Sequence, residues 1–207
     1  MSCLNSFIDW LPDNTILCAH NCKLFDATII VSEVTSVSLM TNFKRKVIGF
    51  IDTLPLFKVN LPERKSYKQT SLVTDILGET YEAHEAMDDT RLLLKLLTSK
   101  NVPLSGFFEH SFTIESVEKY LHDFKRKKDC LRTFKQIIEA KMMSESMADK
   151  AAKTDLRFND LILAAKGDNV DGLFDLLSKP NESDGKPRLT KSTSVIMKIY
   201  NFIRSMD

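Results

Sequence analysis

The chain has 207 residues, 43% of them hydrophobic and 28% charged, enough for one moderate core and a small second one. Its 29 lysines and arginines nearly balance 28 aspartates and glutamates, so the overall charge does not indicate a polyanion partner and any nucleic-acid contact must come from local patches. No apolar run approaches the roughly 20 residues that span a bilayer, and the start lacks the features of a signal peptide. We therefore expect an intracellular protein, nuclear or cytoplasmic, without membrane contact.

The four cysteines are too sparse and irregular for a disulfide framework, which fits a reducing compartment. The close spacing Cys18-Ala-His20-Asn-Cys22 differs from the usual zinc patterns, and no second cysteine pair follows it. A zinc site is therefore not expected.

The first quarter of the chain alternates short apolar runs with stretches that are apolar at helical spacing. The order predicted is a helix at 6–11, a strand at 15–19, a helix at 25–34, a strand at 47–51 and a helix from 53 onward. The strand at 47–51 shows no alternation, as expected of a strand that is buried on both faces. Asp52 precedes the last helix and can cap it. Strands separated by a helix favour parallel pairing in an α/β architecture.

The remainder of the chain reads as helical. Helices are predicted at 69–77, ended by Gly78, and at 85–97, and then at 117–138 as one or two helices, 158–165, 170–177 and 195–203. Residues 101–106 break the pattern, and 178–188 are rich in Pro, Gly and polar residues, as in a loop. We expect a partial α/β domain at 1–102, a linker at 103–116 and an all-α C-terminal module at 117–207.

Two short patterns carry residues suited to chemistry. His20-Asn21 and, four residues on, Phe25-Asp26 follow the first predicted strand, and His84-x-x-x-x-Asp89 opens a predicted helix. Taken singly, an acid in a first helical turn has a structural explanation, because it interacts favourably with the helix dipole. The order of the two patterns, at strand ends and helix starts, points instead to a joint role.

These patterns, with Ile51–Leu56 and Lys65–Lys68 between them, resemble the DEDDh-type 3′–5′ exonucleases, which are DnaQ-like with a ribonuclease H-like fold. The spacing within the first pattern is similar to that of the animal three-prime repair exonucleases. The resemblance covers roughly residues 5–98 and implies an α/β ribonuclease H-like exonuclease core.

By this resemblance, Asp26 and Asp89 bind two divalent cations, Mg²⁺ or Mn²⁺, that promote phosphodiester hydrolysis at nucleic-acid 3′ ends, most simply single-stranded ones. His84 is then the general base, a role suited to an unperturbed pKa of about 6.5. His20 and Asn21 are candidates for substrate contact, although Asn21 also suits the turn. DNA and RNA are both open as substrates.

The family's first two acids form an Asp-x-Glu motif on an upstream strand, and residues 1–19 contain no such motif. The resemblance therefore implies an N-terminally truncated domain that lacks its N-terminal strands and half of its carboxylates and keeps about two central strands. Two-ion binding is then expected to fail or to be weak. A catalytically inactive nucleic-acid-binding or protein-interaction module on the exonuclease scaffold is the alternative.

The predicted C-terminal helices contain the basic run Lys125–Lys128. It can contact phosphates, but a solvated helix face is favoured, because Asp123 and Asp129 flank it. Guidance of a substrate and contact with a protein partner are both open for this region.

Overall fold

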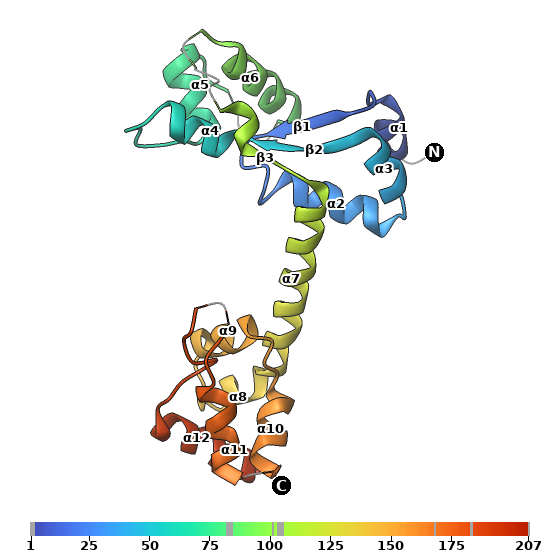
Figure 1. The fold of residues 1–207 in the computed structure, drawn as a ribbon. Coiled ribbons are helices and arrows are strands. Elements are labelled where there is room, and N and C mark those ends of the chain that lie inside the picture. Colours follow the sequence, from blue (N-terminus) through green and yellow to red (C-terminus); the bar gives the residue numbers. More distant parts are fainter. Residues whose placement is uncertain are drawn as a thin grey trace. The chain divides into compact units, whose positions relative to one another are not determined.

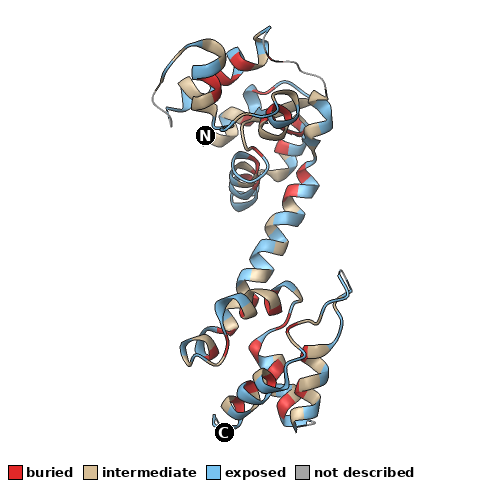
Figure 2. Cartoon of the chain, turned by 90° about the vertical axis from the view of Figure 1, so that its left-hand side faces the viewer, coloured by how far each residue is buried: buried red, intermediate tan, exposed pale blue. Residues whose placement is uncertain are grey.

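A computed structural model describes residues 3–81, 85–100, 102, 106–167, 169–182 and 184–206. The chain divides into two compact units, Met1–Leu121 and His122–Asp207, and helix α7 (Ile114–Thr133) contributes to both (Figure 1). No residue from 118 to 129 in this helix is buried (Figure 2). Within the described ranges, no helix has the length and apolar character to cross a membrane.

The first unit contains a three-stranded sheet in the order β1 (Thr15–Ala19), β2 (Val47–Asp52), β3 (Ser111–Phe112). Strands β1 and β2 are parallel, as predicted, and β3 runs antiparallel to β2. Gly49 permits a close approach of β3, since a Cβ atom there would lie 2.8 Å from the Phe112 carbonyl oxygen. The sequence does not predict β3, because two residues carry no periodicity.

Six α-helices and one short 3₁₀ helix accompany this sheet among the described residues, in addition to the start of α7. They are α1 (Cys3–Trp10), α2 (Asp26–Ser36), α3 (Met40–Lys46), α4 (Thr53–Asn60), α5 (Gln69–Leu77), α6 (Ala86–Thr98) and η1 (Phe107–His110). Helix α5 ends at Gly78, which has a left-handed φ of 68°, as predicted. Helix α3 was not predicted, because its seven residues contain one buried side chain, Phe43.

Two clusters of buried side chains stabilise the first unit. One cluster joins α1, α2 and α3 to the sheet and to Ile114 and Val117 of α7. The other joins α4, α5 and α6 and includes Phe57, Leu72 and Leu92. The α/β part of the chain thus extends into the first turns of α7.

The second unit is helical, and its described residues form one main cluster of buried side chains, which includes Phe134, Leu161 and Ile199. Its further helices are α8 (Lys135–Glu139), α9 (Glu145–Lys153), α10 (Phe158–Gly167), α11 (Asn169–Ser178) and α12 (Thr193–Arg204). The expected loop at 178–188 is present, with one isolated bridge between Pro180 and Pro187.

The predicted fold class is confirmed: a mixed α/β region precedes a helical region. The predicted boundaries at 102 and 117 stay predictions. Compact units are defined by contacts, whereas a domain boundary is a statement about independent folding.

Candidate active site

Asp26 and Asp89, which come from separate motifs, line the same cavity in the first unit, with a volume of about 580 Å³. Asp26 is the first residue of α2, and Asp89 lies in the first turn of α6. His20, directly after β1, and Lys68 and Gln69, at the start of α5, also line it. The cavity therefore collects acids, an imidazole, a cation and an amide from four parts of the chain.

The sheet topology explains how the first motif reaches this cavity. Strands β1 and β2 are parallel, so their carboxyl ends lie at the same edge, where ligand sites of α/β proteins form. The chain turns between β1 and α2 through Asn21, whose φ of 61° is left-handed, a conformation that asparagine tolerates better than most residues. Asn21 thus shapes the turn, and it is not among the residues lining the cavity.

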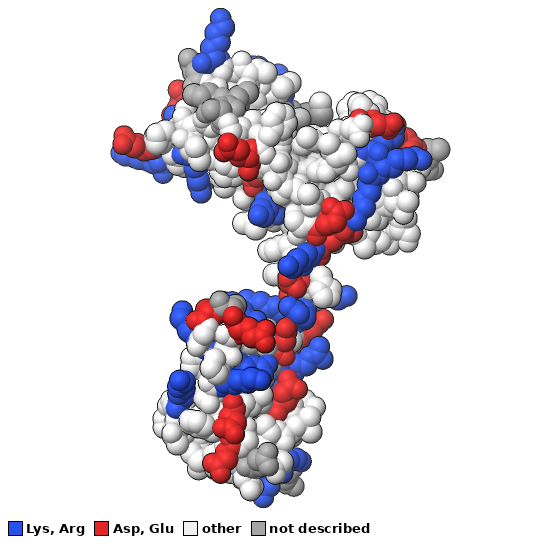
Figure 3. Space-filling model, viewed as in Figure 1, with Lys and Arg blue, Asp and Glu red and all other residues white. Residues whose placement is uncertain are grey.

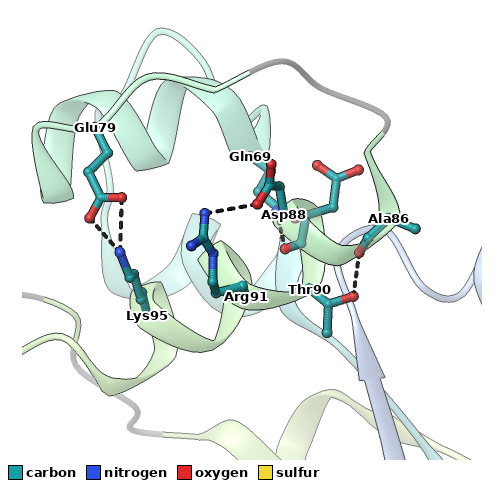
Figure 4. A network of polar contacts seen from close by, with 8 residues as sticks. Gln69, Glu79, Ala86, Asp88, Thr90, Arg91 and Lys95 are labelled. Carbon is teal, nitrogen blue, oxygen red and sulfur yellow. Dashed lines mark hydrogen bonds and ion pairs between the residues drawn. The ribbon is translucent and has the colours of Figure 1, made fainter.

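A hydrogen bond between helices helps to position the second motif. The Gln69 side-chain amide donates to the backbone carbonyl of Asp89 over 2.7 Å, which ties the start of α5 to α6 (Figure 4). The adjacent acid, Asp88, forms an ion pair with Arg91 at 2.8 Å (Figure 4). Asp88 is not among the residues that line the cavity. His84, the expected general base, lies outside the described residues.

His20 links three segments around the cavity. Its Nε2 donates to the Tyr67 carbonyl over 2.8 Å, and its Nδ1 lies 3.0 Å from the Thr53 hydroxyl. Burial lowers the pKa of His20 and favours the neutral ring, whose Nδ1 carries no proton when Nε2 donates to Tyr67. The Thr53 hydroxyl beside Nδ1 also lies 3.4 Å from the Ala19 carbonyl, to which it donates. Both ring nitrogens are engaged within the protein, which gives His20 a positioning role; its contact with substrate stays a prediction.

Asp52 is a buried carboxylate next to this site, 6% exposed. It caps α4 as predicted, with one oxygen accepting from the Leu54 amide at 2.9 Å. Its other oxygen accepts from the Lys23 amide at 3.1 Å, in the turn between β1 and α2. The sequence does not predict this second bond, because it joins residues that are distant along the chain.

Negative charges converge on the cavity. Burial, followed by the nearby carboxylates of Asp52 and Asp89, raises the pKa of Asp26 against the opposing effect of hydrogen bonding and His20. Burial and the carboxylate of Asp89 likewise raise the pKa of Tyr81, another lining residue, to about 12. A carboxylate whose pKa is raised by burial and by like charges is typical of a functional site.

The donor set does not amount to a complete metal centre. Within the part of the chain that the structure describes, no group of three or more His, Cys, Asp or Glu side chains is placed to hold a metal ion. A two-metal site for phosphodiester hydrolysis requires several carboxylates, and the residues described as lining the cavity include two, Asp26 and Asp89. These residues therefore do not fit a pair of divalent cations by themselves.

Comparison with known protein families agrees with the two regions of the fold. Residues 1–97 match the family model described as exonuclease, and residues 130–206 match that of the PML C-terminal domain. Neither the curated proteins nor the solved structures contain a significant match. Residues 1–97 are thus similar to the exonuclease family, and residues 130–206 are similar to the C-terminal domain of PML.

Proposed function

We propose that the exonuclease-family domain acts at the 3′ ends of single-stranded nucleic acid, with the cavity around Asp26 and Asp89 as its site. The observation that carries this proposal is the convergence of these two acids, from separate helices, on one cavity. Lys68, Gln69 and Thr70 line the same cavity at the start of α5. They offer a cation, an amide and a hydroxyl at a helix N-terminus, where a phosphate is favourably bound.

The resemblance to DEDDh exonucleases supports the further assignment of roles. Asp26 and Asp89 are the proposed ligands of Mg²⁺ or Mn²⁺, and His84 is the proposed general base. His20 holds the strand end and the segment before α5 in place through Thr53 and Tyr67.

The same resemblance predicts what these 207 residues lack. They contain no Asp-x-Glu motif, which in the family supplies the other two acids. Among the described strands, β1 pairs with β2 alone, so its outer edge is open to a further strand. We propose that this is where an acidic strand completes the site, as the resemblance to the three-prime repair exonucleases implies. Without it, hydrolysis is expected to be weak or absent.

The shortage of metal ligands among the residues that the structure describes favours a second candidate function: a catalytically inactive module that binds strand ends. This alternative predicts binding to single strands without shortening of them in Mg²⁺ or Mn²⁺. The two candidate functions use the same cavity and differ in whether the bound strand is shortened.

Both candidates can be tested on the purified chain with 5′-labelled single-stranded DNA and RNA. Binding is measured in EDTA by fluorescence anisotropy, and shortening is measured on gels in Mg²⁺ and Mn²⁺. The variants are Asp26→Asn and Asp89→Asn, with Asp88→Asn as the matched control, because Asp88 pairs with Arg91 outside the cavity.

Shortening that falls about 10²-fold or more in Asp26→Asn and Asp89→Asn but persists in Asp88→Asn identifies the hydrolase. Binding without shortening identifies the inactive module. Shortening that is equal in all variants comes from a contaminant, and the absence of both binding and shortening rejects both candidates.

A further inference from the structure

An apolar groove crosses the second unit. It consists of two hollows, of about 770 and 460 Å³, which share Ile138 of α8. Residues at the end of α7 and the start of α9 line the first hollow, and the 140–144 turn and the start of α12 contribute to the second. The half-buried apolar residues that define this groove are Leu131, Ile138, Met142, Met147 and Val195, and the buried Met143 also lines it.

These five residues are half-buried and pack against the core of the second unit, so the floor of the groove rests on a packed core. Two of them, Met142 and Met147, have flexible side chains that adapt to different apolar surfaces. An apolar groove between helices suits the insertion of the apolar face of an added helix. The residues lining it in the described structure include no aromatic ring on which a base could stack.

The basic residues at the rim supply free positive charge. Lys128, Lys141 and Lys198 line the hollows and form no ion pair with any residue that the structure describes. The Lys198 ammonium donates to the Lys141 carbonyl over 2.9 Å, which holds it beside the groove without neutralising it.

The acidic residues at the rim are largely compensated. Asp149 contacts the ammonium groups of Lys127 and Lys153, and hydrogen bonds from them lower its pKa. Glu139 lies 3.8 Å from Lys135. Glu145 forms no ion pair with a residue that the structure describes, although it lies in the first turn of α9, where the helix dipole favours an anion. Among the described lining residues without an ion pair, Lys128, Lys141 and Lys198 outnumber Glu145, so the uncompensated charge around the apolar groove is positive on balance.

Phosphate binding explains this surface less well. Within the basic run 125–128, Arg126 pairs with Asp155 at 3.0 Å and Lys127 pairs with Asp149. On the face seen in Figure 3, basic and acidic side chains of the second unit are interspersed, without a broad basic patch. A polyanion needs such a patch, whereas an apolar floor with a few free lysines does not provide one.

We propose that the apolar groove binds an acidic amphipathic helix of a partner protein, with its apolar face on the floor and its acidic flanks toward Lys128, Lys141 and Lys198. The charge complementarity favours such a helix over a basic one. The proposal concerns residues of His122–Asp207 alone and does not depend on the exonuclease site.

The test uses the full chain and two fluorescein-labelled synthetic peptides of about four helical turns. Both carry leucine at helical spacing on one face; one has glutamate on its flanks and the other has lysine. The charge variant is Lys128→Glu/Lys141→Glu, which keeps the fold because both side chains are exposed. Lys191→Glu, at an exposed position outside both hollows, is the control for a lysine-to-glutamate reversal away from the groove.

We expect the acidic peptide to bind at least about tenfold more tightly than the basic peptide, and the double variant to weaken it about five- to tenfold. Lys191→Glu should have less than a twofold effect. With methyl-labelled methionine, the resonances of Met142 and Met147 should shift on binding, and that of exposed Met87 should not.

Three outcomes would overturn the proposal: equal binding of the two peptides, equal effects of the double variant and Lys191→Glu, or binding that leaves the Met142 and Met147 resonances unmoved. Displacement of the acidic peptide by a single-stranded oligonucleotide would also overturn it, in favour of a nucleic-acid surface.

Discussion

The buried carboxylate of Asp52 offers a sharp test of how the cavity is held together, because each of its oxygens serves a different segment. One oxygen accepts from Leu54 at the start of α4, and the other accepts from Lys23 in the turn that leads to Asp26. Asp52→Asn keeps one acceptor and replaces the other with a donor. Asparagine is as good a helix cap as aspartate, so we expect the bond to Leu54 to survive and the bond to Lys23 to be lost.

The magnitudes follow from these two bonds. A backbone amide left without its acceptor costs about 1–3 kcal/mol, so Asp52→Asn should destabilise the first unit by about that amount. Asp52→Ala also removes the cap, which adds about 1 kcal/mol. Asp88→Asn is the matched control, since its exposed pair with Arg91 is worth about 0–1 kcal/mol.

Hydrogen exchange of individual amides measures this directly. In Asp52→Asn, the Lys23 amide should lose protection while the Leu54 amide keeps it, and in Asp52→Ala both should exchange faster. Urea unfolding gives the total change in the free energy of unfolding. If Asp52→Asn leaves Lys23 protected, or exposes Leu54 as much as Lys23, the division of roles between the two oxygens is wrong.

Three further predictions concern charge and packing. The raised pKa of Asp26 means that the folded state binds the proton more tightly than the unfolded state, whose pKa is near 3.8, so ionisation of Asp26 lowers the stability as pH rises. Asp26→Asn should therefore raise the thermal midpoint more near neutral pH than near pH 4. A wild type that is more stable than Asp26→Asn near neutral pH would contradict this. The lowered pKa of His20 means that the unfolded state, with a pKa near 6.5, binds the proton more tightly, so stability should fall as pH drops from 6.5 through the folded-state pKa. The urea midpoint should fall less steeply with decreasing pH in His20→Asn than in the wild type, and an equally steep fall in both proteins would show that His20 is not the cause. Leu161→Ala, at a fully buried site of α10, should lower the free energy of unfolding of the second unit by about 2–5 kcal/mol, measured in urea. Leu163→Ala, on the same helix but 61% exposed, should change it by less than about 0.5 kcal/mol. Equal losses in the two variants would mean that the core does not depend on Leu161.

Local signals in the sequence predict many of the elements well. The strand at 15–19 has the predicted bounds, because a short β-branched and apolar run stands between turn residues. Helix α5 ends where Gly78 adopts a left-handed conformation, which glycine reaches without steric cost. Asp52 caps α4, because its side chain needs no distant partner for that bond.

Local sequence signals do not predict contacts between distant segments. Strand β3 exists because Gly49 lets the chain approach β2 closely, and its own two residues give no indication of it. The break between α7 and α8 at Phe134 likewise has no signal in the sequence, since the apolar spacing continues through this fully buried residue.

The sequence by itself identified Asp26 and Asp89 as candidate acids of the site, since a strand end and a helix start place them where acids can act. It also determined that these 207 residues contain no Asp-x-Glu motif, because this is a property of the residues alone. The tertiary structure decided that the two acids share a cavity, that His20 is held by Thr53 and Tyr67, and that Asp52 serves two segments. Each of these is a contact across many residues, and packing of the whole unit, not local propensity, brings the partners together.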